Sequence, residues 1–230
     1  VYQQLMGYWH ETMHDDVSLI MSDGWLEASK PRMAIVDKQR KLTEEPDLVI
    51  GTGKNAKKYK MDLVPPPLIV GRYFAAEQAK IDDLNAAADE ATRAVDEYVE
   101  EHAVEDGLLA DAVDEEKLSK ALVTARLKTI MSGGDPDEIK ALQHAVKLYN
   151  AEAAAKKLTK DAQADLDVAT LKKYGDVTES VVKTLVLDDK WEATIVRRVA
   201  AEVDALTLGL VVRIQQLGER YVTTVGDLAA

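Results

Sequence analysis

The sequence predicts a mainly α-helical protein whose long helices form an antiparallel, coiled-coil-like hairpin or bundle beside a small N-terminal α/β part. Three observations predict this fold class: a heptad pattern in residues 68–102, a strong helix-start signal at Asp135, and a third apolar stripe in residues 195–221. Each stretch is roughly three times as long as the average globular helix of about 11–12 residues. Helices of this length need other helices to cover their apolar sides.

The first long helix is expected over Leu68–His102, directly after three consecutive prolines at residues 65–67. Its apolar residues are spaced seven and then alternately three and four apart, which is a heptad seam. A scaffold hairpin within the chain and a docking surface for another protein both fit this seam, and we expect packing within the chain to cover part of it. The predicted partner-binding residues are Phe74, Ile81, Leu84, Ala88, Ala91, Val95 and Tyr98.

The second long helix has the clearest local signals in the sequence. Asp135 can cap the helix, Pro136 suits the first helical position, and Glu138 follows three residues after the cap. The helix should therefore run from Pro136 to Tyr174, where Gly175 ends it. Because its length nearly equals that of the first long helix, we expect the two to form an antiparallel hairpin.

The remaining elements complete a division into a mixed α/β remnant at residues 1–62 and a helical arm at residues 63–230. The third long helix, expected from Asp188-Asp189 to Tyr221, steps by four, four and three residues, and this eleven-residue repeat differs from a heptad. The shorter predicted elements are a helix at Val1–His14, a strand at Val17–Met21, β-leaning pieces at Met33–Val36 and Leu48–Ile50, a helix at Glu115–Met131 capped by Asp114, and a helix at Thr178–Leu187.

Charge is unevenly distributed along the chain. The net charge is −12, yet residues 29–60 contain nine Lys and Arg against four Asp and Glu, which gives +5 there and −17 elsewhere. Lysines beside glycines can contact DNA phosphates, so we predict DNA-backbone contacts by Lys54, Lys57, Lys58 and Lys60; an ordinary solvated loop is the alternative.

Composition also bounds the class of protein. Cysteine is absent, which excludes disulfides, and no apolar run approaches the ~18 residues that a membrane span requires. We therefore expect a cytoplasmic protein without a membrane partner. The sequence begins at Val1 within a helical pattern, and we expect it to be part of a longer protein.

Several segments resemble the methylation (M) subunits of type I restriction-modification enzymes. The longest is Lys58–Gln78, which surrounds the three prolines. The others follow in the same order along the chain: Tyr8-Trp9, Glu11-Thr12-Met13, Asp15-Asp16-Val17, Asp23-Gly24-Trp25, Lys30-Pro31-Arg32, Glu105-Asp106-Gly107-Leu108-Leu109, Lys183-Thr184-Leu185-Val186 and Asp188-Asp189-Lys190-Trp191.

The resemblance implies the C-terminal part of an adenine-N6 DNA methyltransferase, with long helices that pack on the DNA-specificity (S) subunit. It further implies a second M subunit, an R subunit and DNA in the full complex, and S-adenosylmethionine as the cofactor of the full-length parent. Gly51-Thr52-Gly53 and Pro65-Pro66 lack the neighbours that the family's cofactor loop and catalytic Asn-Pro-Pro-aromatic motif require. We therefore expect no catalytic, cofactor-binding or metal-binding residues in this chain, which leaves open whether it takes part in an enzyme.

A rival motif occurs near the N-terminus. His10-Glu11-Thr12-Met13-His14 has the H-E-x-x-H spacing that places two zinc-binding imidazoles and a general base on one helix. A third ligand is hard to identify, since Val17 stands where the extended motif has glycine. A zinc metallopeptidase therefore remains an alternative function, as does a self-associating coiled-coil adaptor suggested by the long apolar seams.

Overall fold

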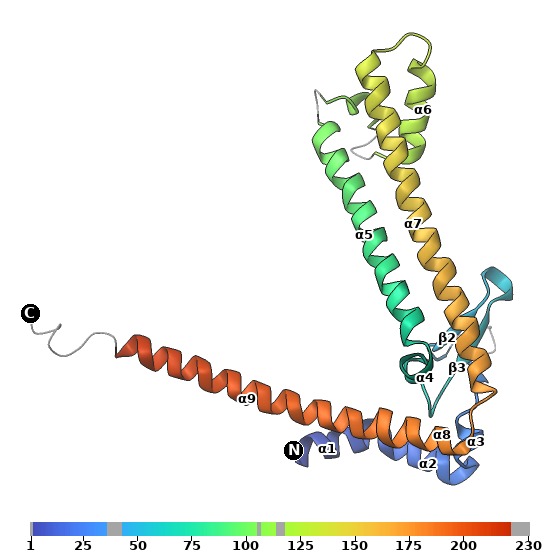
Figure 1. The fold of residues 1–230 in the computed structure, drawn as a ribbon, viewed down its shortest axis with the longest axis vertical. Coiled ribbons are helices and arrows are strands. Elements are labelled where there is room, and N and C mark those ends of the chain that lie inside the picture. The colour runs from blue at the N-terminus through green and yellow to red at the C-terminus, as the bar shows by residue number, and fades with distance from the viewer. Residues whose placement is uncertain (1, 36–42, 105–106, 114–117, 222–230) are drawn as a thin grey trace, which may run out of the picture. The chain divides into compact units, whose positions relative to one another are not determined.

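The computed structural model describes residues 2–35, 43–104, 107–113 and 118–221. It confirms a mainly α-helical fold with a small three-stranded sheet in the N-terminal part (Figure 1). The α-helices are α1 (Tyr2–Tyr8), α2 (His14–Asp23), α3 (Trp25–Ala28), α4 (Pro66–Tyr73), α5 (Ala75–His102), α6 (Lys120–Ile130), α7 (Pro136–Tyr174), α8 (Glu179–Thr184) and α9 (Ala193–Arg220). Within the described residues, none of these helices combines the length and the apolar character that a membrane span requires.

The remaining elements are short. Two π-helical segments, η1 (Trp9–Met13) and η4 (Leu185–Glu192), join α1 to α2 and α8 to α9. The strands and 3-10 turns are β1 (Arg32–Met33), β2 (Leu48–Ile50), β3 (Lys57–Lys60), η2 (Gly53–Asn55) and η3 (Ala110–Ala112). The sheet order is β1-β3-β2, with Arg32 opposite Lys60 in the antiparallel β1–β3 pair.

The chain forms two compact units. The first consists of Val1–Val49, Lys57–Ile69 and Leu171–Ala230, and the second of Ile50–Ala56 and Val70–Thr170. The first unit thus combines the N-terminal helices and the sheet with α8 and α9. The division at residues 62 and 63 predicted from the sequence stays a prediction about the domains of the protein.

The core of the first unit joins its distant chain segments. Its fully buried side chains come from the segment before α4, from α4 itself and from α8 and η4: Leu63, Val64, Ile69, Val182, Leu185 and Val186. The Tyr174 hydroxyl donates a hydrogen bond of 2.6 Å to the Val64 carbonyl oxygen, and burial raises the pKa of this phenol. This bond fixes the end of α7 on the segment that carries the prolines.

The second unit is a hairpin of α5 and α7, and α6 and η3 pack at the end where α7 begins. We call this end the head of the unit. Helices α5 and α7 lie side by side along the stem (Figure 1), where the Thr92 hydroxyl lies 3.3 Å from an oxygen of Glu152. At the head, α6 and η3 pack on the first turns of α7 around a core of Leu109, Ala112, Val123, Ile130, Ala141, Leu142 and Ala145. Arg126 of α6 pairs with Glu138 of α7 and with Asp111, which ties the head together.

Four of the sequence predictions require correction. Residues 17–21 belong to α2 and form no strand, because the helix continues to Gly24, whose φ of +80° ends it. The helix expected over residues 68–102 is two helices, since the backbone leaves helical angles at Phe74 (φ −132°, ψ 28°). Helix α6 begins at Lys120 and is capped by Ser119, whose hydroxyl oxygen accepts from the Leu122 amide. The helix expected over residues 178–187 is α-helical only to Thr184 and continues as η4.

The other predicted elements agree with the structure in whole or in part, or fall outside it. The long helix expected from Asp188-Asp189 to Tyr221 is α-helical from Ala193 to Arg220, because residues 188–192 belong to η4. Helix α7 has the predicted bounds, and the Asp135 carboxylate accepts a hydrogen bond of 3.0 Å from the Asp137 amide. The β-leaning piece Leu48–Ile50 is β2, whereas Met33–Val36 shares only Met33 with β1, and β3 was not predicted. Residues 36, 105–106 and 114–117, which include the proposed Asp114 cap, lie outside the described residues.

Arg32 ties the first strand of the sheet to two carboxylates. Its guanidinium donates two hydrogen bonds to Glu44, of 2.5 and 2.9 Å, and two of the same lengths to Asp62. The Glu44 carboxylate also accepts a bond of 2.6 Å from the Ile35 amide. These donors, Arg32 first, lower the pKa of Glu44 from its ordinary value of 4.5 to about 2.

The lowered pKa predicts an acid-sensitive contact in the first unit. Because the carboxylate form is favoured in the folded state, Glu44 stabilises the fold above pH 4.5 and loses this contribution as the pH falls towards 2. In an NMR titration of the Glu44 side chain we expect a midpoint near 2, and Arg32→Gln should move this midpoint up towards 4.5. A midpoint near 4.5 in the unmodified protein contradicts the prediction.

Candidate functional site

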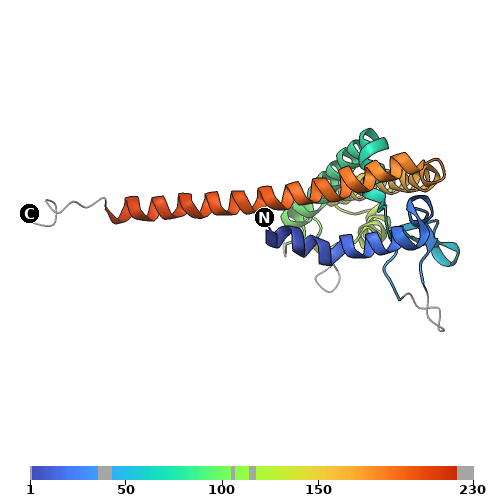
Figure 2. The same cartoon turned by 90° about the horizontal axis from the view of Figure 1, so that it is seen from below.

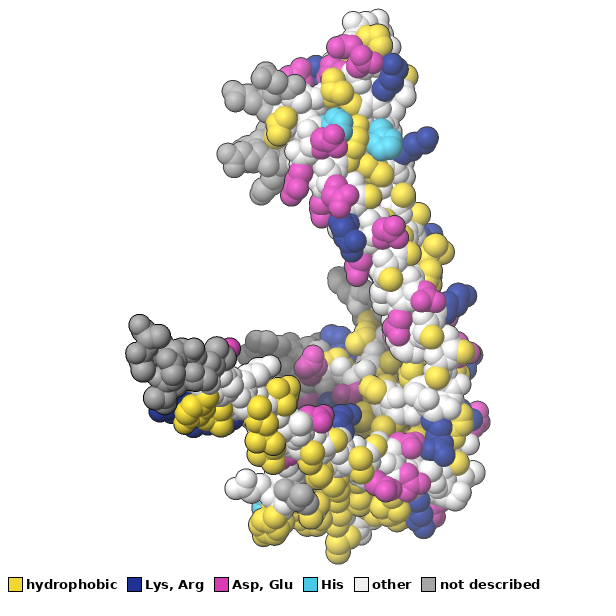
Figure 3. Space-filling view, turned by 60° about the vertical axis from the view of Figure 1, so that its left-hand side comes forward, with side chains coloured by type: hydrophobic (Ala, Val, Ile, Leu, Met, Phe, Trp, Pro, Cys, Tyr) yellow, Lys and Arg dark blue, Asp and Glu magenta, His cyan; other side chains and the backbone are white. Residues whose placement is uncertain are grey.

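The strongest candidate for a functional surface is the outer part of α9. From Ala200 to Tyr221 every residue is exposed, although the segment is rich in large apolar side chains (Figure 3). Six of them recur at intervals of three and four residues and so share one side of the helix. We call this set the α9 stripe, and its exposed fractions are Val203 54%, Leu206 70%, Leu210 61%, Ile214 59%, Leu217 37% and Tyr221 69%.

The first turns of α9 extend the line of the α9 stripe and are less exposed. Ile195 and Val199 lie on the line of the α9 stripe and are half-buried. Helix α1 contacts this part of α9, with the Gln4 amide 3.0 Å from the Glu202 carboxylate (Figure 2). Arg198 pairs with Glu11 and lies 4.9 Å above the Tyr8 ring. Helix α1 therefore packs on a side of α9 that is adjacent to the line of the α9 stripe, and the stripe itself is open beyond Val199.

A buried polar cluster lies where α9 begins. The Asp16 carboxylate, 5% exposed, accepts hydrogen bonds from the Lys190 ammonium at 2.8 Å and the Trp191 indole at 2.9 Å. The same ammonium donates a hydrogen bond of 2.8 Å to the Leu63 carbonyl oxygen. The Tyr8 hydroxyl donates a hydrogen bond of 3.2 Å to the Lys190 carbonyl oxygen. We call Tyr8, Asp16, Lys190 and Trp191 the root cluster. Its members come from segments that carry the family resemblance, but sequence reasoning did not bring them together.

The seam of α5 is largely covered by other parts of the second unit. Ile81, Ala88 and Val95 are 3%, 7% and 5% exposed, and the other predicted partner-binding residues Phe74, Leu84, Ala91 and Tyr98 are half-buried. The Tyr98 hydroxyl donates to the Ala141 carbonyl oxygen of α7 at 3.2 Å. Packing within the unit thus occupies the centre of this seam, and the docking role predicted for it stays a prediction.

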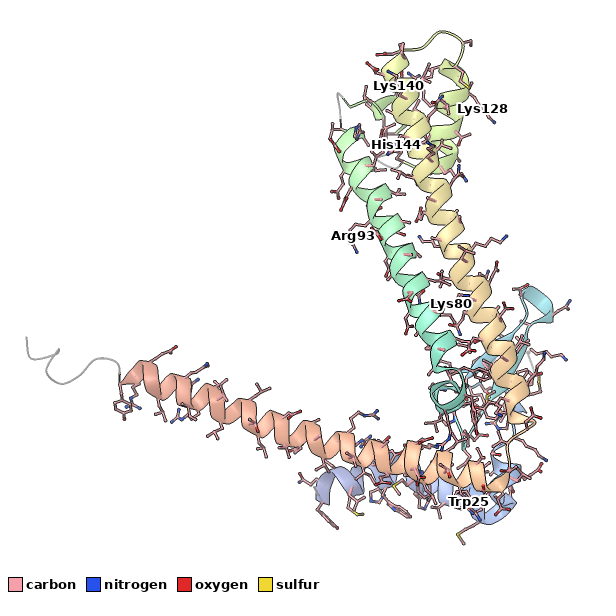
Figure 4. The ribbon with its side chains drawn as sticks, viewed as in Figure 1. Trp25, Lys80, Arg93, Lys128, Lys140 and His144 are labelled. Carbon is pink, nitrogen blue, oxygen red and sulfur yellow. The ribbon has the colours of Figure 1, made fainter. Side chains whose placement is uncertain are left out.

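The open surface near the head of the second unit carries aromatic and charged groups. Tyr98, Leu108, Asp137, Lys140, Ala141 and His144 line a shallow pocket, in which Lys140 and His144 extend from α7 (Figure 4). The centroid of the Tyr98 ring lies 4.1 Å from that of the stacked His102 ring and 4.7 Å from that of the tilted His144 ring. Lys140 pairs with Asp137 at 2.9 Å, so the pocket offers no strong single charge to a ligand.

The predicted DNA-contacting lysines differ in their surroundings. Lys57 is exposed and Lys58 is half-buried, whereas Lys60 forms an ion pair of 2.8 Å with Asp47. The side chain of Lys54 lies outside the described residues, and its backbone belongs to η2 between β2 and β3. The structure therefore leaves Lys57 as the most accessible described member of this set.

The H-E-x-x-H residues do not form a metal site with other described residues. Glu11 pairs with Arg198, which lowers the pKa of the carboxyl, and the His14 ring lies 3.2 Å from Asp15. Among the residues that the structure describes, no group of three or more His, Asp or Glu side chains could hold a metal ion. The general base that a peptidase requires is thus engaged in an ion pair.

Comparison with known proteins adds no relative. The chain matches no protein-family model, no curated protein and no solved structure.

Proposed function

We propose that this chain is an assembly module of a type I restriction-modification methyltransferase, the C-terminal part of its M subunit, which binds helices of the S subunit through the α9 stripe. The observation that carries the proposal is the exposure of six large apolar side chains on one side of one helix. A monomeric protein rarely exposes a contiguous apolar surface of this kind, and such surfaces mark protein–protein contacts.

The arrangement of α1 supports a helix as the binding partner. Helix α1 already packs along the first turns of α9, and its exposed Tyr2 and Leu5 lie near the point where the cover stops. A partner helix packed along the α9 stripe, beside the side of α9 that α1 contacts, would bury Val203 to Tyr221. Helix-on-helix packing of this kind uses residues three and four apart, which is the spacing of the α9 stripe.

In the complete complex the module works with further components. The family resemblance supports S-adenosylmethionine as the cofactor of the parent M subunit, with a second M subunit, an R subunit and DNA as its other partners. Lys57 and Lys58 are candidates for contacts with the DNA backbone, and such contacts are sensitive to salt and carry no sequence specificity.

Binding of the S subunit tests the proposal. Leu210→Asp places a charge at the centre of the α9 stripe and should weaken binding of the cognate S subunit at least tenfold, about 1.4 kcal/mol. Gln215→Asp adds the same charge on another side of α9 and should leave binding within twofold. Calorimetric titration measures both.

Two outcomes count against the proposal. Undiminished binding by Leu210→Asp excludes the α9 stripe as the docking surface. A stable dimer of the chain alone, lost in Leu210→Asp when the mass is measured by light scattering, favours the self-associating adaptor instead.

A further inference from the structure

The root cluster joins two neighbouring residues of one helix to a single carboxylate. Lys190 and Trp191 follow each other in η4, yet the Lys190 ammonium lies 2.7 Å and the Trp191 indole nitrogen 2.9 Å from the same oxygen of Asp16. In a regular α-helix, consecutive side chains point about 100° apart around the axis. Two adjacent side chains can meet more easily at one acceptor where the helix turns less per residue.

The π-helical geometry of η4 provides this smaller turn. The Ala193 amide donates to the Asp188 carbonyl oxygen, five residues earlier, so each π turn holds one residue more than an α turn. A π turn is rare and less favourable than an α turn, and such turns are often found at functional sites. The buried ionic contact with Asp16 supplies a local reason for η4 to retain it.

The register of η4 determines which way α9 faces. If one π turn became an α turn, every later residue would rotate about the helix axis by about 100°. Glu202 would then leave Gln4, Arg198 would leave Glu11, and the α9 stripe would point in another direction relative to α1.

We propose that Asp16 is a positioning residue: by binding Lys190 and Trp191 together it holds η4 in its π register and so sets the direction of the α9 stripe. This inference rests on the proposed function in one respect: the direction of the α9 stripe matters for binding only if a partner docks there. The positioning itself concerns contacts within the first unit and can be tested without a partner.

The test removes the contact of Asp16 with Lys190 and Trp191 without leaving a buried charge. Asp16→Asn removes the counter-ion of the Lys190 ammonium, whereas the double variant Asp16→Leu/Lys190→Met replaces both charged groups with apolar ones of similar size, a change that proteins often tolerate. Asp15→Asn is the matched control, because Asp15 is the exposed neighbour of Asp16. Circular dichroism and thermal unfolding establish that each variant is folded and helical.

Cross-linking then reports the direction of α9. The natural sequence contains no cysteine, so Gln4→Cys can be combined with a single cysteine at position 201, 202 or 203 and treated with a short bis-thiol reagent. In the unmodified and Asp15→Asn backgrounds we expect position 202 to react fastest, because Gln4 and Glu202 are in contact. In the double variant the preference for position 202 should fall at least fivefold, with a gain at a neighbouring position.

Each result has a distinct meaning. An unchanged preference for position 202 in a folded double variant overturns the positioning role of Asp16. A changed preference together with at least tenfold weaker S-subunit binding supports both proposals. If the preference changes but the unmodified protein binds no S subunit, the positioning role stands and the proposed function fails.

Discussion

Replacing Ile81 by aspartate is expected to destabilise the second unit by about 4 kcal/mol, because the new carboxylate is buried between α5 and α7 without a partner. Ile81 is 3% exposed and lies near Leu166 of α7, which is 4% exposed. Denaturant unfolding followed by circular dichroism measures the change in the free energy of unfolding. The second unit is expected to lose stability because Ile81 belongs to the buried apolar seam between α5 and α7.

Ala79→Asp is the control for this variant. Ala79 lies two residues away on α5 and is exposed, so the substitution adds the same charge at the surface, together with a larger loss of helix propensity because alanine is the best helix former. We expect this variant to lose less than about 1 kcal/mol. Equal losses for the two variants would mean that the buried packing of the seam does not stabilise the unit.

Leu142→Ala is expected to cost about 2–5 kcal/mol, the range for removing a fully buried leucine side chain and leaving a cavity. Leu142 is 0% exposed in the core of the head, where α6 and η3 meet α7. Because the two units have separate cores, the loss should fall on the second unit. Hydrogen exchange should therefore quicken in α6 and in the first half of α7 and stay unchanged in α8.

Leu158→Ala provides the comparison on the same helix. Leu158 is 58% exposed, so its truncation should change the free energy of unfolding by less than about 0.5 kcal/mol. If the two variants lost a similar free energy of unfolding, this would contradict the observation that Leu142 is buried in the core and Leu158 is exposed.

Helices with strong local signals were predictable from the sequence. Helix α7 has both predicted ends because Asp135 and Pro136 fix its start and Gly175 ends it, and none of these signals depends on distant residues. The predicted strand at residues 17–21 was wrong for a related reason. A short apolar run is compatible with a strand or a helix, and only the continuous hydrogen bonding from η1 into α2 decides between them.

The π-helical segments and the break at Phe74 were not predictable. No residue type requires a π turn, and the contact that accompanies η4 joins Asp16 to Lys190 across 174 positions of the chain. At Phe74 the sequence continues an acceptable helical pattern, yet the structure bends there and Phe74 lies with Ile81 and Leu166 around one groove between α5 and α7. Contacts between residues that are far apart in the sequence cannot be predicted from the spacing of apolar residues within one helix.

The candidate site shows the same limit. The sequence contains long apolar patterns on α5 and on α9, and the heptad on α5 predicts the docking role for that helix. Spacing reports that a face needs to be covered but not which segment covers it. In the structure, Ile81 and Val95 are buried, whereas Leu206 and Leu210 are 70% and 61% exposed.

The open α9 stripe has a consequence for the chain in the cell. A copy with no partner on the stripe displays a run of apolar side chains, which favours aggregation and recognition by chaperones and proteases. If the proposed docking occurs, it removes this signal, so unassembled copies are cleared while assembled copies persist. The proposed docking surface would then also keep the amount of this chain matched to the amount of its partner.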